Sequence, residues 1–250
     1  DYTKGKAELL CKQDGIIAGL DVFARTFALL DDKTEVIFHC QDGDAVQSGE
    51  LLAEVIGDIR VILSGERTAL NYLQRMSGIA TYTRSLADIL EGSGTKLLDT
   101  RKTMPGMRLL DKYAVRLGGA RNHRLNLGDM LMLKDNHIDA AGSIVKAVDA
   151  LRRAYSPCPP IEVECRTLDH VREAIAARAD RIMMDNMDGQ RLSQALALVP
   201  RSIETEVSGG VRLDTIRALA LTEPRRPDFI SVGRLTHSAV SADFSMTLRA

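Results

Sequence analysis

The sequence has no tryptophan and few other aromatic residues: phenylalanine, tyrosine and tryptophan together make up 4% of its 250 residues. Proteins that bind single-stranded nucleic acid usually stack the bases on aromatic side chains beside a basic groove. A formal net charge of −1 also gives the whole molecule no electrostatic attraction for nucleic acid. Both features argue against a nucleic-acid partner.

Long apolar runs are missing too. No segment approaches the roughly 18 apolar residues that indicate a transmembrane helix, so we expect no membrane partner. The chain opens Asp1-Tyr2-Thr3-Lys4, which is not the pattern of a signal peptide. The four cysteines form no CxxC pair and have no histidine at zinc-finger spacing, as expected of reduced thiols in a cytoplasmic protein.

The first part of the sequence predicts a small β-rich domain followed by a helix. Strand-like runs at residues 15–19, 34–39 and 57–63 are separated by glycine and aspartate. Residues 66–91 then carry leucine, methionine and isoleucine at helical spacing, with Gly78 as the single breaker.

From about residue 95 the pattern alternates between strand and helix, which is typical of a parallel sheet, open or closed into a barrel. We expect strands at residues 96–100, 130–134, 161–165, 181–185, 203–207 and 229–233. We expect helices at residues 140–155, 168–178, 189–198 and 213–221. Six strands are fewer than the eight of a complete α/β barrel.

Polar residues stand at the ends of several of these runs. They are Asp99, Lys134, Glu164, Asp185 and Ser208. Ligands of parallel α/β folds bind at the carboxyl ends of the strands. One such residue could simply begin a solvated loop, but five of differing chemistry indicate a binding site.

Residues 101–134 are strongly basic, with eight lysines and arginines against two aspartates in a chain whose net charge is −1. A solvated helix face would mix acids with bases. Arginine pairs with carboxylate or phosphate through two hydrogen bonds, and lysine acts on phosphate as a point charge. The stretch therefore predicts a site for a small polyanion.

Two acids and two glycine turns follow this basic stretch. Mg²⁺ is commonly bound by a few protein oxygens together with substrate phosphate, so Glu164 and Asp185 predict a magnesium site. Alternatively, each acid pairs with a nearby arginine. Turns at residues 208–210 and at Gly233 would let backbone N–H groups approach a phosphate near a helix N-terminus. Two such turns at successive strand ends are the arrangement of a phosphate site in an α/β barrel.

Nine segments, in order through nearly the whole chain, resemble the quinolinate phosphoribosyltransferase family of carboxylating nicotinate-nucleotide pyrophosphorylases. The two most specific lie within residues 99–106, with the sequence DTRKTMPG, and residues 133–138, with the sequence LKDNHI. The others are residues 66–71, 77–81, 122–124, 163–164, 184–186, 208–210 and 231–238.

The resemblance implies an α/β fold, with a mixed α/β N-terminal domain followed by an open α/β barrel of about seven strands. On this basis we expect the N-terminal domain and its connecting helix at residues 1–94 and the catalytic barrel at 95–238. Residues 239–250 would pack back on the N-terminal domain. The resemblance also implies a homodimer whose active sites are shared between subunits.

The resemblance further implies a reaction of de novo NAD biosynthesis. Phosphoribosyl pyrophosphate and quinolinate, with Mg²⁺ as cofactor, give nicotinate mononucleotide, pyrophosphate and CO₂. The implied quinolinate ligands are Arg67 (reaching in across the dimer), Arg101, His123, Arg124 and Lys134. The implied phosphate ligands are Lys102, Lys112, Ser208, Gly209, Gly210 and Gly233. Glu164 and Asp185 would hold the metal, and the catalytic residues would be Lys102, Lys134, Glu164 and Asp185.

Two alternatives share part of this pattern. A paralogous group associated with molybdenum transport has the same fold, but the carboxylate clamp of Arg101, His123 and Arg124 favours quinolinate. A non-catalytic sensor of phosphoribosyl groups or nucleotides would keep the glycine turns without needing the two carboxylates together with Lys134.

Overall fold

The structure is a computed structural model that describes residues 3–249. By compactness the chain divides into two units. The first comprises Asp1–Ser85, Lys102–Ala120 and Arg234–Ala250, and the second comprises Leu86–Arg101 and Arg121–Gly233. The domain boundaries expected from the sequence stay a prediction, because compactness and ancestry need not divide a chain at the same residues.

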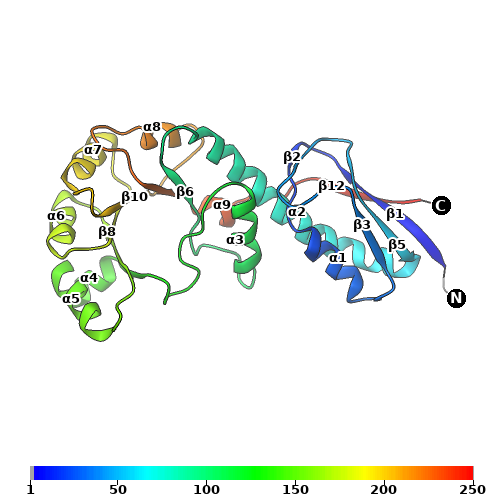
Figure 1. Cartoon of the computed structure of the whole chain (residues 1–250), viewed down its shortest axis with the longest axis horizontal. Coiled ribbons are helices and arrows are strands. Elements are labelled where there is room, and N and C mark those ends of the chain that lie inside the picture. Colours follow the sequence, from blue (N-terminus) through cyan, green and yellow to red (C-terminus); the bar gives the residue numbers. More distant parts are fainter. Residues whose placement is uncertain (1–2, 250) are drawn as a thin grey trace. The chain divides into compact units, whose positions relative to one another are not determined.

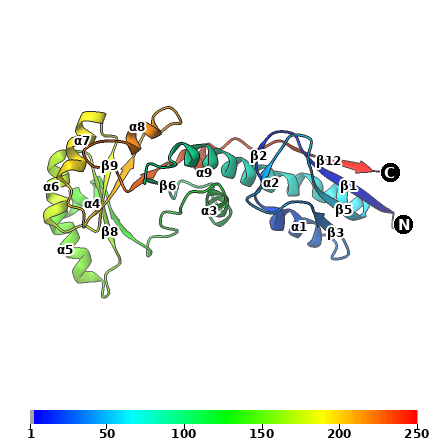
Figure 2. The ribbon, with the colours of Figure 1, turned by 45° about the horizontal axis from the view of Figure 1, so that its top comes forward.

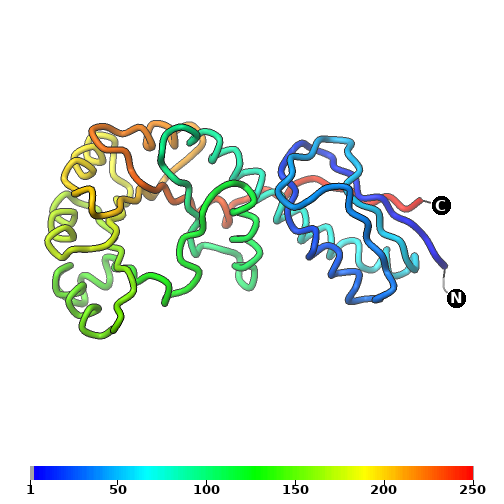
Figure 3. Tube along the Cα trace, viewed as in Figure 1, coloured from blue at the N-terminus to red at the C-terminus, as the bar shows by residue number. Residues whose placement is uncertain are grey.

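An antiparallel four-stranded sheet forms the framework of the first unit, in the order β12-β1-β5-β3 (Figure 1). Its strands are β12 (Phe244–Arg249), β1 (Lys4–Cys11), β5 (Leu51–Asp58) and β3 (Glu35–Phe38). Strands β1 and β12 come from opposite ends of the chain and lie side by side (Figure 3). A separate two-stranded sheet pairs β2 (Gly15–Ile16) with β4 (Ala45–Val46).

Helix α1 (Leu20–Ala28) was missed by the expectation of a β-rich domain. The Asp42 carboxylate accepts hydrogen bonds from the backbone N–H groups of Gly19 and Leu20, at 2.9 and 3.0 Å. These N–H groups at a helix start have no partner within the helix, so a distant acid can serve as their cap. The cap lies more than 20 residues further along the chain, where a search for local helix-start signals does not find it.

Helix α2 (Ile59–Ile89) confirms the predicted helix but begins earlier than expected. The strand predicted at residues 57–63 is therefore wrong beyond Asp58, whose carboxylate accepts a hydrogen bond from the backbone N–H of Arg60 at 2.9 Å and favours a helix start. At Gly78 a Cβ atom would lie 2.0 Å from the carbonyl oxygen of Val240, which explains a glycine inside this helix. Helices α3 (Arg108–Leu117) and α9 (Arg234–His237) also belong to the first unit.

A parallel six-stranded sheet forms the framework of the second unit, in the order β6-β11-β10-β9-β8-β7. It confirms all six predicted strands: β6 (Lys96–Leu98), β7 (Leu131–Leu133), β8 (Ile161–Cys165), β9 (Arg181–Asp185), β10 (Glu204–Ser208) and β11 (Phe229–Ser231). The additional strand of a seven-stranded barrel is reduced to one parallel bridge between Leu98 and Arg121, at the β6 edge.

Helices cover the outer side of this sheet (Figures 1 and 2). They are α4 (Asp135–Ala141), α5 (Ile144–Ala154), α6 (Leu168–Ala176), α7 (Gly189–Leu198) and α8 (Ile216–Ala220). The helix predicted at residues 140–155 is two helices, because Gly142 adopts a left-handed φ of 82° and Ser143 caps α5. Within residues 3–249, no helix has both the length and the apolar character needed to cross a bilayer.

Candidate active site

One face of the parallel sheet carries polar side chains, which come from the neighbouring strands β8, β9, β10 and β11. Residues two apart on a strand share a face, and partners in a parallel ladder face the same way. The register therefore sorts these side chains into three levels, listed here toward the carboxyl ends of the strands. They are Glu162, Arg181 and Glu204; then Glu164 and Glu206, with the apolar Met183 between them; then Asp185, Ser208 and Ser231.

The deepest part of this face holds a buried charge cluster around His123. Its Nε2 atom lies 3.0 Å from a carboxylate oxygen of Glu162 and 3.3 Å from one of Glu206. Arg181 approaches the same Glu206 carboxylate at 3.3 Å, and its guanidinium lies over the Phe229 ring at 4.2 Å. Both glutamates are fully buried, so each of their charges depends on these partners.

The cluster shifts the protonation of its members. Burial would lower the pKa of His123, but hydrogen bonds and charge attraction from Glu162 and Glu206 raise it to about 9. Burial and the Glu206 charge raise the pKa of Glu162 to about 7. The Nδ1 atom of His123 accepts a hydrogen bond from the Arg124 backbone N–H at 2.7 Å, which favours the neutral ring with its hydrogen on Nε2. A proton shared between Nε2 of His123 and the Glu162 carboxylate agrees both with this hydrogen bond and with the raised pKa of the two groups.

Near the carboxyl ends of the strands, Lys134, Glu164 and Asp185 come together, as the sequence predicted. The Lys134 ammonium contacts the Glu164 carboxylate. Arg166, which was not among the predicted residues, approaches Glu164 at 3.3 Å and Asp185 at 3.6 Å. The guanidinium also pairs with Asp135 at the start of α4, at 2.8 Å. The alternative of pairing with a nearby arginine is therefore confirmed for both acids, and the magnesium site stays a prediction.

The donor set fits Mg²⁺. Glu164 and Asp185 lie on the neighbouring strands β8 and β9 and present carboxylate oxygens, the ligands that this ion prefers. A second set of possible ligands, His123, Glu162 and Glu206, is found among the described residues. Both glutamates of this second set are fully buried, whereas Asp185 is partly exposed at a strand end, where a hydrated Mg²⁺ and a substrate phosphate can reach it, so the first pair is the better magnesium site.

Arg101 and Arg124 form a cationic pair in the second unit. Burial lowers the pKa of Arg124, and repulsion from the Arg101 charge lowers it further. One Arg124 Nη atom donates to the Met130 carbonyl at 2.8 Å and fixes the direction of the guanidinium. Two like charges held near one another are a favourable place for an anion.

The Ser208-Gly209-Gly210 turn follows β10 directly. Both glycines have positive φ, 93° and 63°, which other residues adopt only with strain. A Cβ atom at Gly209 would lie 2.2 Å from the Asn186 side chain, whereas one at Gly210 would meet open space. The helix N-terminus that the sequence predicted beside this turn does not follow it directly, because α8 begins only at Ile216. A phosphate here would depend on backbone N–H groups of the turn.

Three predicted ligands, Arg67, Lys102 and Lys112, belong to the first unit, and their roles stay predictions. Arg67 and Lys102 are exposed, whereas Lys112 is only 3% exposed. A buried pair organises this region: Arg75 donates two hydrogen bonds to Asp111, at 2.8 and 2.9 Å.

That pair also holds the loop that carries Lys102. Asp111 accepts a hydrogen bond from the backbone N–H of Met104 at 3.2 Å. Arg75 donates to the carbonyl of Thr236, whose hydroxyl in turn donates to the Lys102 carbonyl at 2.9 Å. The loop is therefore positioned by side chains of α2, α3 and α9.

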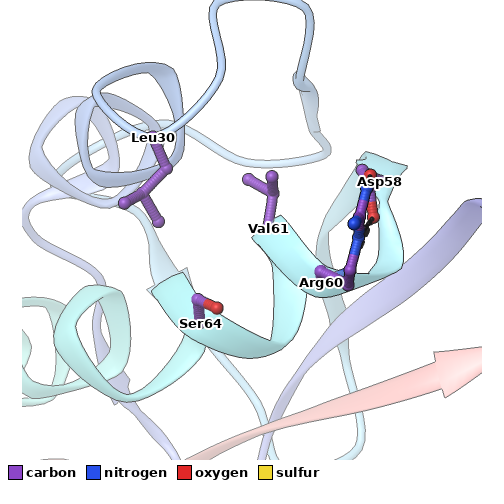
Figure 4. A pocket seen from close by; sticks show the side chains of 5 residues that line it. All are labelled: Leu30, Asp58, Arg60, Val61 and Ser64. Carbon is purple, nitrogen blue, oxygen red and sulfur yellow. Dashed lines mark hydrogen bonds and ion pairs between the residues drawn. The ribbon is translucent and has the colours of Figure 1, made fainter. Parts of the chain in front are cut away.

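The first unit also has an open surface hollow of about 270 Å³, lined by Leu30, Asp58, Arg60, Val61 and Ser64 (Figure 4). Its one arginine is paired with its one acid, Arg60 with Asp58. None of the predicted site residues lines this hollow, so we do not assign the reaction to it.

Sequence reasoning missed Glu162, Glu206 and Arg181 as members of the polar face. A signal was present, because the strand sequences IEVEC and ETEVS place glutamates within segments expected to be buried on both faces. Arg166 gave no comparable signal, since an arginine just after a strand is typical of a solvated loop.

Two family models match the chain: the quinolinate phosphoribosyl transferase N-terminal domain over residues 1–77 and the C-terminal domain over residues 79–247. A probable nicotinate-nucleotide pyrophosphorylase [carboxylating] of Bacillus subtilis (strain 168) is 46% identical over 96% of this chain and 82% of its own length. The chloroplastic nicotinate-nucleotide pyrophosphorylase [carboxylating] of Arabidopsis thaliana is 41% identical over 97% of this chain and 74% of its own.

Solved structures agree with these matches. The crystal structure of NadC from Streptococcus pyogenes superposes with a TM-score of 0.92 at 44% identity, covering 100% of this chain and 88% of that one. The nicotinate-nucleotide pyrophosphorylase from Francisella tularensis has a TM-score of 0.94 at 38% identity, with the same coverage.

Proposed function

The chain belongs to the quinolinate phosphoribosyltransferase family, and we propose that it transfers phosphoribosyl from phosphoribosyl pyrophosphate to quinolinate with loss of CO₂. The products are nicotinate mononucleotide and pyrophosphate, so the enzyme is a pentosyltransferase of de novo NAD biosynthesis. The observation that carries the proposal is the group of Lys134, Glu164 and Asp185 at the strand ends of a chain with this family membership.

Quinolinate is a dianion and needs more than one cation. We assign its carboxylates to Arg101, Arg124 and Lys134 from the second unit. His123, expected from the resemblance to bind a carboxylate as well, instead uses its ring nitrogens on Glu162, Glu206 and the Arg124 backbone N–H, so we assign it to positioning Arg124. The Arg101–Arg124 repulsion supports the assignment of the carboxylates, because an anion between two like charges relieves it. The segment that carries His123 and Arg124 is held to the sheet by the contacts of His123 with Glu162 and Glu206.

Phosphoribosyl pyrophosphate is assigned to the remaining residues. The 5′-phosphate would lie on Ser208, Gly209, Gly210 and Gly233, with Lys102 and Lys112 contacting phosphate oxygens. Glu164 and Asp185 would hold Mg²⁺, which when bound neutralises charge on the pyrophosphate as it leaves.

The reaction itself needs positioning more than acid–base chemistry. The quinolinate ring nitrogen attacks the anomeric carbon as pyrophosphate departs, and the strand-end carboxylates favour the positive charge that develops on the sugar. The ring nitrogen is then cationic and accepts the electron pair released when the adjacent carboxylate leaves as CO₂. The Lys134 ammonium pairs with the Glu164 carboxylate at a partly exposed position, so it can turn toward the charge of a bound substrate.

We further propose a homodimer in which Arg67 of one subunit completes the quinolinate site of the other. Arg67 is exposed on α2, which supports this proposal because the side chain is accessible to another subunit. The partners of the reaction are small molecules, and we propose that it takes place in the cytoplasm without nucleic acid or membrane.

Substrate choice tests the proposal. A pocket built for two carboxylates keeps unpaired buried positive charge when nicotinate brings only one, so kcat/KM should favour quinolinate by at least about 100-fold. Consumption of each acid with phosphoribosyl pyrophosphate and Mg²⁺ can be followed by absorbance. Equal values, or a preference for nicotinate, would refute quinolinate as the substrate, and absence of turnover with both would favour a binding protein.

A further inference from the structure

We propose that Arg166 is a resident counter-ion of Glu164 and Asp185, and that it makes metal binding at these acids depend on the arrival of a phosphate group. The proposal rests on the proposed function, in which the two carboxylates bind Mg²⁺. It assigns a role in metal and phosphate binding to a residue that neither the strand-end pattern nor the basic stretch includes.

Arg166 contacts the two proposed metal ligands, so a metal ion would have to compete with its guanidinium for their carboxylates. The residue follows β8 directly, and its guanidinium reaches three acids on three segments: Glu164 at 3.3 Å, Asp185 at 3.6 Å and Asp135 at 2.8 Å. Lys134 adds a second cation on Glu164. Each of the two proposed metal ligands thus already has a cation of the chain itself as a partner.

A metal ion entering this site alone would meet positive charge within a few ångströms of its ligands. Such neighbours disfavour a cation much as they favour the ionised form of a carboxylate. The Arg166 side chain is 52% exposed, so it can leave the acids without opening a buried core. Its contact with Asp135 is its closest, which gives the guanidinium one anchor at the edge of the site.

A pyrophosphate group changes this balance. Guanidinium groups pair with phosphate oxygens through two hydrogen bonds, so an arriving phosphate offers Arg166 an alternative to Glu164 and Asp185. The released carboxylates can then bind the metal, which also contacts the phosphate. By linkage, phosphate raises metal affinity and metal raises phosphate affinity by the same factor.

Mn²⁺ binding to the full chain measures this coupling. Free Mn²⁺ can be followed by electron paramagnetic resonance, with and without inorganic pyrophosphate and with Mn²⁺–pyrophosphate complexes included in the fit. The natural chain should bind Mn²⁺ weakly alone and more tightly with pyrophosphate. Arg166→Gln should bind Mn²⁺ alone on the order of ten-fold more tightly, the equivalent of about one pKa unit of charge interaction. Its gain from pyrophosphate should shrink accordingly.

Two sets of variants separate the possible failures. Arg172→Gln removes an arginine of similar exposure, 57%, which pairs with Asp169 on α6, and it should leave Mn²⁺ binding unchanged. Glu164→Gln and Asp185→Asn should weaken Mn²⁺ binding with pyrophosphate present. If they do, but Arg166→Gln binds Mn²⁺ like the natural chain, the role of Arg166 is wrong. If neither acid variant weakens binding, the metal site itself is wrong.

Discussion

The two units differ in the side chains that they bury against their main sheets: those of the first are mainly apolar, and several of those of the second are charged. In the first unit, the core between the antiparallel sheet and its helices is apolar: Leu9, Phe23, Phe27, Leu52 and Leu73 are fully buried in one cluster. In the second unit, Val163, Ile182 and Val207 form the apolar face of the parallel sheet, and the opposite face carries charge. A buried charge stabilises a fold less than a hydrocarbon of the same size does. The difference indicates that the first core serves stability, whereas the charged face of the second serves the reaction.

The variants with the largest expected effect test whether the first unit, through Arg67, also contributes to the reaction. Arg67→Ala and Lys134→Ala should each lower turnover by at least about 100-fold, because each removes a cation from a dianion site. Co-expression of the two variants should restore activity. In a random mixture of dimers, roughly one site in four receives intact Arg67 from one chain and intact Lys134 from the other.

Separately tagged chains allow the mixed dimer to be purified before the assay. A combination of Lys134→Ala with Asp185→Ala is the matched control, since both changes fall in the second unit and no mixed site is intact. Activity in the control, or none in purified mixed dimers of the first pair, would contradict the shared site.

Glu206→Ala tests the charged face itself. The change removes the fully buried carboxylate that Arg181 and His123 share, at 3.3 Å from each, and the free energy of unfolding should fall by about 3–5 kcal/mol. Glu204→Ala is the control, because Glu204 pairs with the same arginine at 2.7 Å but is 53% exposed. It should cost less than about 1 kcal/mol. Urea unfolding of the two variants gives both values. Similar decreases in the free energy of unfolding would show that burial of the glutamate does not determine its contribution.

The same contrast explains what the sequence could predict. Alternating strands and helices, and polar residues at strand ends, depend on short-range patterns, and all six parallel strands were found with bounds within two residues. Lys134, Glu164 and Asp185 were expected together for the same reason. The family membership, first seen as a resemblance of nine segments, is confirmed by both family models.

The features that were missed depend on contacts between distant segments. Helix α1 is capped by Asp42, and a strand-like apolar run at residues 59–63 is the first turn of α2. The partners of His123 come from β8 and β10, which local periodicity cannot pair. Arg166 reaches three acids only because the turns after β7, β8 and β9 meet at one edge of the sheet.

Leu52→Ala tests the apolar core. Leu52 is fully buried on β5, so the change should cost about 3 kcal/mol through lost burial and the cavity left behind. Because the charged face lies in the other unit, the kcat of the folded fraction should stay within about two-fold of that of the natural chain. Urea unfolding and steady-state kinetics below the transition measure the two effects. A large fall in kcat without unfolding would mean that the first core also positions the active site.

The smallest expected effect is a dependence of stability on pH that belongs to the second unit alone. The pKa of Glu162 is raised from 4.5 to about 7, so its contribution is complete below pH 4.5 and is lost as the pH rises through 7. The pKa of His123 is raised from 6.5 to about 9, and its contribution is lost as the pH rises from 6.5 through 9. Both groups therefore lower the free energy of unfolding between pH 6.5 and 8.5. A shared proton keeps the two losses from adding, so we expect about 1–2 kcal/mol.

Urea unfolding at pH 6.5, 7.5 and 8.5 measures this slope, and two variants assign it. Glu162→Gln removes one of the acids that hold the proton on His123, so the slope should become smaller even if the variant is less stable throughout. Leu52→Ala lowers stability in the first unit without touching the cluster, so it should keep the full slope. The range stops at pH 8.5 because burial raises the pKa of Cys11 and Cys165 above the ordinary 9.0, and their titration would add to the slope at higher pH. A free energy of unfolding that stays level or rises over this range would show that the buried cluster holds no proton at neutral pH. An equal slope in Glu162→Gln would show that Glu162 does not hold that proton.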